Sequence, residues 1–310
     1  MSSSCSEEDL RTKELLELCQ DIVQDMEEYM KPGKAAPIAY ETHFLCISAL
    51  FRVLLARKEY SERALKVSLE AIRNNPADYS CWDFRRQILQ KMIGQSSAML
   101  QRELEICDQL CLENPKNYQV WFHRRFLCSY LENPQHELEF TETTLLEDAK
   151  NYHAWSHRQW VVDLFEVLGK EEEIFSKKLL EMDFRNNSAW NYRYFILFSN
   201  QKTAVHSLQL RQSEVNFAWE MLQRSWRNES AWHYLWKVID HEWNLFPWIT
   251  QAIEELKEQQ ETSHNRFVWI TWFHILTYRG ETSQANHILD KLRNELDTFH
   301  SSFWSCGKEE

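Results

Sequence analysis

The sequence predicts an all-α protein, a right-handed superhelix of antiparallel helical hairpins. A tryptophan block recurs at steps of 39, 34, 35 and 42 residues, and its tryptophans are Trp82, Trp121, Trp155, Trp190 and Trp232. Periods of this size are typical of stacked hairpins, because a single hairpin cannot bury its apolar face without its neighbours. Glycine and proline number only 5 and 6 among 310 residues, which favours helices with short connections over a sheet protein rich in turns.

The N-terminal elements follow from apolar spacing. Leucine, isoleucine and methionine at helical intervals predict a helix over about residues 7–30, and KPGKAAP (Lys31–Pro37) predicts its end and a flexible tether. The helical pattern resumes near Tyr40. We therefore divide the chain into residues 1–38 and a single repeat domain over 39–310, with clear repeats over about 60–243 and divergent hairpins beyond them.

Each hairpin is expected to place its first helix before the tryptophan block, as in Ser61–Pro76, and to begin its second helix at the block itself. The long step of 42 residues is explained by an insertion, Ser199–Leu210, which we expect to extend a loop. NRFVWITWFHIL (Asn265–Leu276) is expected to be a degenerate sixth copy, with Trp269 at a step of 37. A divergent last repeat is typical of such arrays, because a terminal repeat has only one neighbour.

Two positions around the repeating tryptophan have structural explanations. The fourth residue before it always has a short polar side chain able to cap a helix N-terminus: Asp78, Asn117, Asn151, Asn186 and Asn228. The third residue after it is an arginine in four copies and a leucine in the fifth: Arg85, Arg124, Arg158, Arg193 and Leu235. Because these arginines recur in successive repeats, we interpret them as ties between hairpins rather than as ligand contacts.

Composition excludes several classes of protein. The net charge of −12 disfavours general nucleic-acid binding, since an acidic surface repels phosphate backbones. The eight cysteines contain no CxxC pair, which is typical of reduced, packed thiols. Cys107 and Cys111 could share a metal ion, but packing on an apolar helix face is the favoured interpretation and no metal site is expected on this chain. No apolar run is long enough to span a bilayer, so we expect a cytoplasmic protein without a transmembrane segment.

A polar set in repeats two and three is the candidate site. A lysine precedes the helix cap and a tyrosine follows it, with a further polar residue next: Lys116, Tyr118 and Gln119, then Lys150, Tyr152 and His153. Helix N-termini present free N–H groups and a positive dipole end, so two of them side by side would form an anion site suited to a phosphate or diphosphate. Alternatively, the tyrosines only pack between repeats and the lysines are solvated, as Tyr79 recurs in repeat one without a lysine.

The blocks PKNYQVW, DAKNYHAW and RNNSAWN closely resemble the alpha subunit shared by protein farnesyltransferase and protein geranylgeranyltransferase type I. The resemblance runs from about Ser61 to about Leu235. It implies a crescent of tetratricopeptide-like hairpins wrapped around a beta subunit, as an obligate heterodimer that is inactive as the alpha subunit alone. The implied reaction alkylates the cysteine of CaaX-terminated proteins such as small GTPases, with farnesyl or geranylgeranyl diphosphate as donor. The resemblance also implies zinc on the beta subunit, and magnesium if the enzyme is a farnesyltransferase.

The same resemblance implies roles for individual residues. Lys116 and Tyr118 are implied to be catalytic, with the lysine stabilising the departing diphosphate. Diphosphate binding is implied for Lys116 and for the three residues of the NYH motif, which are Asn151, Tyr152 and His153. Gln119 and Tyr79 are implied to contact the acceptor peptide.

Two alternatives remain open at this stage. The alpha subunit of Rab geranylgeranyltransferase shares the tryptophan repeats, although its third block typically has phenylalanine at the position of Tyr152. A non-catalytic helical scaffold would share the fold and bind no diphosphate. The choice between farnesyl and geranylgeranyl donors, the need for magnesium and the identity of the beta subunit depend on partner residues, and the sequence assigns no role to the N-terminal segment or the C-terminal hairpins.

Overall fold

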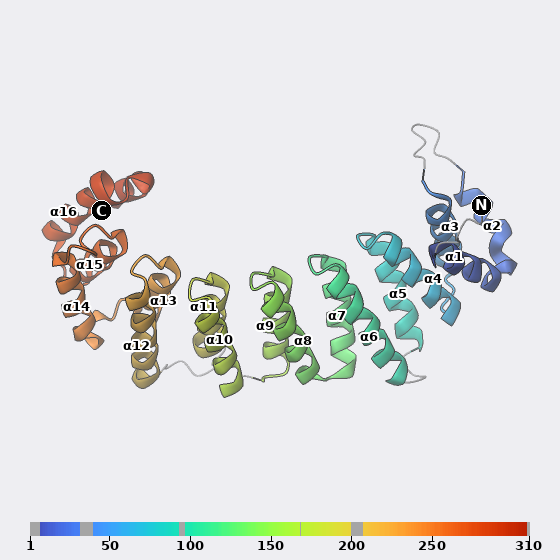
Figure 1. Ribbon diagram of the computed structural model, residues 1–310, viewed down its shortest axis with the longest axis horizontal. Helices are drawn as coiled ribbons and strands as arrows, with labels where there is room; N and C mark the ends of the chain where they lie inside the picture. The colour runs from blue at the N-terminus through green and yellow to red at the C-terminus, as the bar shows by residue number, and fades with distance from the viewer. Residues whose placement is uncertain (1–6, 32–39, 93–96, 168, 200–206, 309–310) are drawn as a thin grey trace. The chain divides into compact units, whose positions relative to one another are not determined.

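Antiparallel helical hairpins make up the computed structural model of the chain, which describes residues 7–31, 40–92, 97–167, 169–199 and 207–308 (Figure 1). Within these ranges there is no β-strand, and the all-α prediction is confirmed. The chain divides into two compact units, Met1–Val167 and Leu168–Glu310. The prediction of a single repeat domain over 39–310 stays a prediction.

The first unit contains three N-terminal helices and three complete hairpins. Its α-helices are α1 (Glu7–Leu18), α2 (Val23–Tyr29), α3 (Thr42–Arg57), α4 (Glu62–Asn74), α5 (Tyr79–Met92), α6 (Ser97–Glu113), α7 (Tyr118–Leu131), α8 (Pro134–Glu147) and α9 (Tyr152–Leu164). The pairs α4–α5, α6–α7 and α8–α9 are the hairpins of repeats one to three. Their second helices α5, α7 and α9 also pack on one another in that order.

The second unit continues the same pattern. Its α-helices are α10 (Lys170–Met182), α11 (Asn187–Tyr194), α12 (Leu208–Arg224), α13 (Glu229–Ile239), α14 (Pro247–Glu258), α15 (Arg266–Tyr278) and α16 (Thr282–Lys291). Short 3₁₀ or π turns accompany them at Phe195–Ser199, Trp243–Leu245, Leu292–Leu296, Thr298–His300 and Phe303–Lys308. Helix α15 is the second helix of the expected sixth copy, and Asn265 caps it as the other copies are capped.

Some expected element bounds differ from the structure. The helix expected over residues 7–30 is two helices, because a 3₁₀ turn at Gln20–Ile22 separates α1 from α2. Nearly all of the tether Lys31–Pro37 lies outside the described residues. The same is true of 200–206 within the expected loop Ser199–Leu210. Of the rest of that segment, Ser199 ends a π-helical turn, Ser207 caps α12, and Leu208–Leu210 form the first turn of that helix.

Within each of the two units, one backbone carbonyl links a hairpin to the next. The indole N–H of each repeating tryptophan donates to the carbonyl six residues earlier, as from Trp121 to Pro115 at 2.9 Å. The amide group of the following repeat's cap donates to the same oxygen, as from Asn151 to Pro115 at 3.1 Å. Equivalent pairs of hydrogen bonds meet at Pro76, Phe184 and Trp226. Asparagine rather than aspartate suits these positions, because the bond requires an amide donor.

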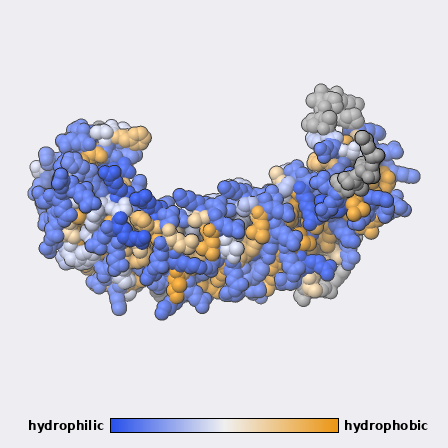
Figure 2. Space-filling view, viewed as in Figure 1, coloured by the Kyte–Doolittle hydropathy of each residue, from blue (hydrophilic) through white to orange (hydrophobic). Residues whose placement is uncertain are grey.

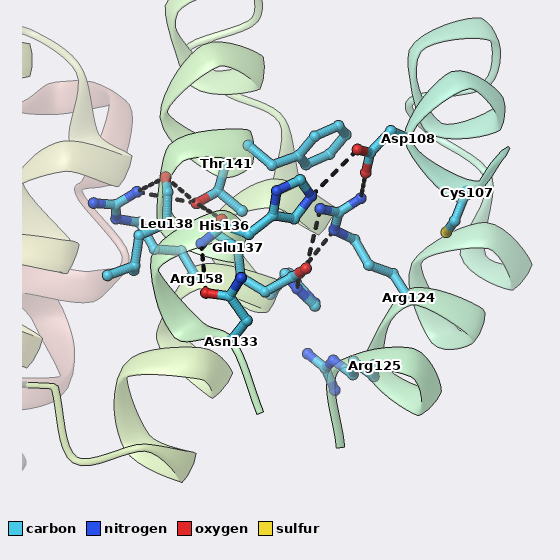
Figure 3. A network of polar contacts seen from close by, with 12 residues as sticks. Cys107, Asp108, Arg124, Arg125, Asn133, His136, Glu137, Leu138, Thr141 and Arg158 are labelled. Atoms are coloured by element: carbon cyan, nitrogen blue, oxygen red, sulfur yellow. Dashed lines mark hydrogen bonds and ion pairs between the residues drawn. The ribbon is translucent and has the colours of Figure 1, made fainter. Parts of the chain in front are cut away.

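Buried arginine–carboxylate pairs form the second link between hairpins. Arg124, on α7, donates two hydrogen bonds to Glu137 of α8 at 2.8 and 3.1 Å, and His157 of α9 contacts the same carboxylate at 2.5 Å (Figure 3). The same arrangement recurs with Arg85, Glu103 and His123, and with Arg193, Glu214 and Tyr234. The interpretation of these arginines as ties between hairpins is confirmed for Arg85, Arg124 and Arg193.

The core follows the repeat. The side chains of Trp82, Trp190 and Trp232 are at most 1% exposed, because each is enclosed between its own hairpin and its neighbours. On the face shown in Figure 2, hydrophilic residues predominate and hydrophobic residues form separate patches. The core therefore lies between the helices of each unit.

Candidate functional site

The N-termini of α7 and α9 lie next to each other and carry the residues that the sequence singled out. The caps Asn117 and Asn151 place them there: each side-chain oxygen accepts hydrogen bonds from two amides of its own first turn. Because Asn151 also donates to Pro115, the two helix starts are held in register. Tyr118 and Tyr152 are the first residues of their helices, and each is 69% exposed.

Aromatic contacts join the two helix starts. The rings of Tyr118 and His153 meet edge to face with centroids 4.3 Å apart, and the ring of Tyr152 lies 5.5 Å from His153. His153 therefore lies within reach of both phenols, and it also stacks near Trp121 at 6.4 Å. A shallow cavity of about 230 Å³ opens at this point, lined by the two tyrosines, His153 and other residues of α7 and α9.

The charge on Lys116 lies at the edge of this cluster. Its side chain is 79% exposed, and its ammonium nitrogen is 3.6 Å from a carboxylate oxygen of Asp148, in the turn before α9. An exposed pair of this kind contributes little to stability and rearranges easily when an anion arrives. The positive dipole ends of α7 and α9 add to the ammonium charge, so the cluster favours an anion although the chain carries a net charge of −12.

His153 is neutral at physiological pH. Burial lowers the pKa of its imidazole below the usual 6.5, and a hydrogen bond with the backbone of Lys116 offsets only part of that effect. A neutral imidazole keeps one donor and one acceptor. Its one N–H is the donor of the bond to the Lys116 backbone, and the other ring nitrogen is an acceptor.

The other predicted residues have distinct positions. Gln119 is half-buried in the first turn of α7, next to the tyrosine pair. Tyr79 is the first residue of α5 and is 70% exposed, one repeat before Tyr118. Asn151 is buried, and its side chain is engaged in the cap and in the bond to Pro115. Lys150 is exposed just before that cap. The structure thus brings the NYQ and NYH motifs together and places Tyr79 on the neighbouring helix.

Arg125 is a residue of this cavity that the sequence analysis did not select. It lies two turns after Tyr118 on the same face of α7 and lines the cavity with Tyr152 and His153. A signal was available in the sequence. The fourth residue after the tryptophan is arginine only in repeats one and two, as Arg86 and Arg125, and the later copies have Gln159, Tyr194 and Trp236.

Larger cavities lie elsewhere. One of about 750 Å³ lies among α2, α3, α4 and α5, and one of about 520 Å³ lies around Trp236 in the second unit. Neither contains the lysine and tyrosine set. Across the described ranges, no three histidine, cysteine or carboxylate side chains converge as metal ligands, so these residues do not fit a zinc site. None of the described helices is both long and apolar enough to cross a membrane.

Comparison with known proteins gives the family. Residues 61–92, 100–131, 134–165, 170–200 and 211–242 match the protein prenyltransferase alpha subunit repeat. The chain is also 30% identical over 281 residues to protein farnesyltransferase/geranylgeranyltransferase type-1 subunit alpha of Candida albicans, covering 86% of this chain and 89% of that protein. The chain belongs to the protein prenyltransferase alpha subunit family. A shorter match, 41% identical, covers 32% of this alpha subunit chain and 32% of the subunit of the same name from Schizosaccharomyces pombe.

A solved structure shows the same fold for this prenyltransferase alpha subunit. The structure of Candida albicans protein geranylgeranyltransferase-I complexed with GGPP contains a chain with a TM-score of 0.75 and 29% identity, covering 89% of this chain and 92% of that one. The geranylgeranyl transferase type-2 subunit alpha of Mus musculus is a more partial match, at 30% identity over 45% of this chain and 26% of that protein. The sixth copy at α15 lies beyond the five matched repeats, although Asn265 and Trp269 form the same bonds.

Proposed function

We propose that this chain is the alpha subunit of a heterodimeric CaaX protein prenyltransferase of the farnesyl or geranylgeranyl type-1 class, located in the cytoplasm. The observation that carries the proposal is the convergence of Lys116, Tyr118, Tyr152 and His153 at two adjacent helix N-termini. The name of the Candida albicans relative and the GGPP complex of the similar structure support the same class of donor.

The proposed chemistry follows from charge. When the carbon–oxygen bond of an allylic diphosphate breaks, negative charge accumulates on the departing oxygens. In this proposal the Lys116 ammonium and the Tyr118 and Tyr152 phenols donate to those oxygens. They stabilise the transition state more than the ground state because the charge grows as the bond breaks. His153 donates one further hydrogen bond when its N–H turns from the Lys116 backbone to the diphosphate. Asn151 acts through its cap, by holding Tyr152 and His153 in place.

The remaining components are proposed for the partner. A beta subunit supplies the zinc site, because the described residues of this chain provide no such set of ligands. When bound, zinc holds the acceptor cysteine as a thiolate nucleophile. Magnesium is needed if the complex is a farnesyltransferase. The alpha chain is inactive alone, since half of the proposed site belongs to the partner. Gln119 and Tyr79 contact the end of the acceptor peptide.

The test replaces Lys116 with alanine in the chain co-expressed with its beta partner. We expect assembly to be retained and the single-turnover rate to fall by about one to three orders of magnitude, the scale of losing one preplaced donor. Lys66→Ala is a matched control, because Lys66 is an exposed lysine on α4, far along the chain from the NYQ and NYH motifs. An unchanged rate in the Lys116 variant would contradict the proposed role.

A parallel assay decides between the two prenyltransferase classes. The purified heterodimer is offered CaaX peptides or Rab proteins with their escort protein. Transfer to the CaaX peptides is the expected result, supported by the tyrosine at position 152 and by the lower coverage of the type-2 relative. Transfer only to Rab proteins would assign the chain to the type-2 class instead.

A further inference from the structure

Two adjacent arginines on α7 point to different surroundings. The side chain of Arg124 is fully buried, and it donates to Glu137 of α8 and to Asp108 of α6. In Figure 3 these bonds form one network, and no dashed line joins Arg125 to it. Arg125 instead lines the cavity between α7 and α9. Arg125 therefore takes no part in the bonds between Arg124, Glu137 and Asp108.

Arg125 is held firmly in the wall of that cavity. One terminal nitrogen donates to both the carbonyl and the hydroxyl oxygen of Ser156, each at 3.1 Å. The guanidinium also lies over the ring of Trp160, at 5.2 Å from its centroid. Both contacts are to α9, so the charge is fixed beside Tyr152 rather than free to move in solvent. A fixed charge loses little entropy when a ligand binds.

The charge of Arg125 has no counter-ion among the side chains that the structure describes. Among the residues described, no carboxylate forms an ion pair with it. Arg86 is at the same position in repeat one, and its guanidinium lies 3.8 Å from Asp83. In repeat two the position of Asp83 is occupied by Phe122, so the carboxylate that accompanies Arg86 is missing beside Arg125. An uncompensated, half-buried cation is unusual in a chain with a net charge of −12.

We propose that Arg125 is a second cation of the diphosphate site, acting on the bound diphosphate across the cavity together with Lys116. This inference rests on the proposed function. Burial lowers the pKa of the guanidinium, and the nearby Tyr152 opposes that shift, but an arginine stays charged at any physiological pH. A partner subunit that covers the cavity would exclude water and strengthen the interaction further.

The test measures inhibition by inorganic pyrophosphate, in competition with the prenyl diphosphate, in the assembled heterodimer. Arg125→Met should raise the inhibition constant about tenfold and reduce its salt dependence, as expected for the loss of one partly screened charge. Arg125→Lys keeps the charge and should stay within about threefold of the wild type. Arg86→Met is the comparison variant at the same position of repeat one, and it should change the constant by less than about twofold, because Arg86 contacts Asp83 and Phe122 and does not itself line the cavity.

The outcomes separate this inference from the proposed function. If Lys116→Ala weakens pyrophosphate inhibition and Arg125→Met does not, Arg125 has no such role and the proposed function stands. If neither variant changes pyrophosphate inhibition, both the role of Arg125 and the proposed function are contradicted. If Arg125→Lys raises the pyrophosphate inhibition constant as much as Arg125→Met does, the residue only holds α7 and α9 together. Should Arg125→Met fail to assemble, the pyrophosphate inhibition constants of Phe122→Asp and Phe122→Asn are compared instead. The aspartate restores at position 122 the carboxylate that repeat one has as Asp83. Equal inhibition constants for the two variants would overturn the proposal.

Discussion

Asn228 offers a sharp test of the carbonyl link between hairpins. Its side chain is buried at 3% exposure, its oxygen accepts from Ala231 at 3.4 Å, and its amide donates to Phe184 at 2.7 Å. Asn228→Ala removes the cap and one buried hydrogen bond, each worth about 1 kcal/mol, so the expected loss in the free energy of unfolding is about 2 kcal/mol. The carbonyl of Phe184 keeps its bond from Trp190, which limits the cost.

Asn228→Asp should be worse than Asn228→Ala, although aspartate is as good a cap as asparagine. The carboxylate would face the carbonyl of Phe184 with no donor and little solvent. An uncompensated buried charge costs about 3–5 kcal/mol, and the α13 dipole offsets about 1 kcal/mol, which leaves a loss of about 3 kcal/mol. Asn133→Asp is the matched control, because Asn133 is an exposed cap on α8 and the change should cost under about 0.5 kcal/mol.

Two measurements check this order. Urea denaturation gives the free energy of unfolding for each variant, and hydrogen exchange of the first-turn amides of α13 shows whether the loss is local. Both are made on the heterodimer, with the partner at the same concentration throughout. If Asn228→Asp is as stable as the wild type, the amide bond to Phe184 does not hold the hairpins together.

Three further outcomes are expected. Gln119→Ala should raise the KM for the acceptor peptide severalfold with little change in kcat, and an unaltered peptide KM would remove that residue from the peptide site. Glu103→Gln should cost about 3 kcal/mol at pH 7, because it leaves the buried Arg85 charge unpaired. Burial alone would raise the pKa of Glu103, but Arg85 and a hydrogen bond from His123 lower it to about 2, so this stabilisation is present above about pH 4.5 and is lost as pH falls towards 2. The free energies of unfolding of the wild type and of Glu103→Gln should therefore converge below about pH 3. A constant difference between them at every pH would contradict the role of the ionised Glu103 carboxylate. Trp269→Phe should cost about 1 kcal/mol through the lost bond to Ser263, measurable as a lower Tm, if the sixth copy is built like the others.

The positions that repeat in the sequence were predictable in physical terms. A capping residue acts on its own first turn, so the spacing from Asn117 to Trp121 is enough to place the start of α7. The partners of the arginines were not predictable in the same way. Glu103 lies 18 residues after Arg85 on an acidic first helix with several other carboxylates, and only packing selects which one faces inward. The break between α1 and α2 also lacked a signal, since no glycine or proline marks it.

The candidate site was partly predictable for a similar reason. Lys116, Tyr118, Tyr152 and His153 flank caps, so adjacent hairpins had to bring them together once the repeat was recognised. Arg125 was overlooked because it follows Arg124, and two neighbouring residues on a helix face directions about 100° apart. A sequence motif shows both arginines as one unit, whereas the structure places one in the network of Glu137 and the other in the cavity wall.

The shared carbonyl has a consequence for how such a chain can change length over evolution. The oxygen of Pro115 accepts one bond from its own tryptophan and one from the next cap, and the joints at Pro76, Phe184 and Trp226 use the same two donors. A duplicated or deleted hairpin would therefore find compatible donors for this carbonyl without compensating substitutions at the tryptophan or the cap. Gene lineages could add or lose units at the C-terminal end, as α15 with Asn265 illustrates, while the pair that carries Lys116 and Tyr152 stays untouched.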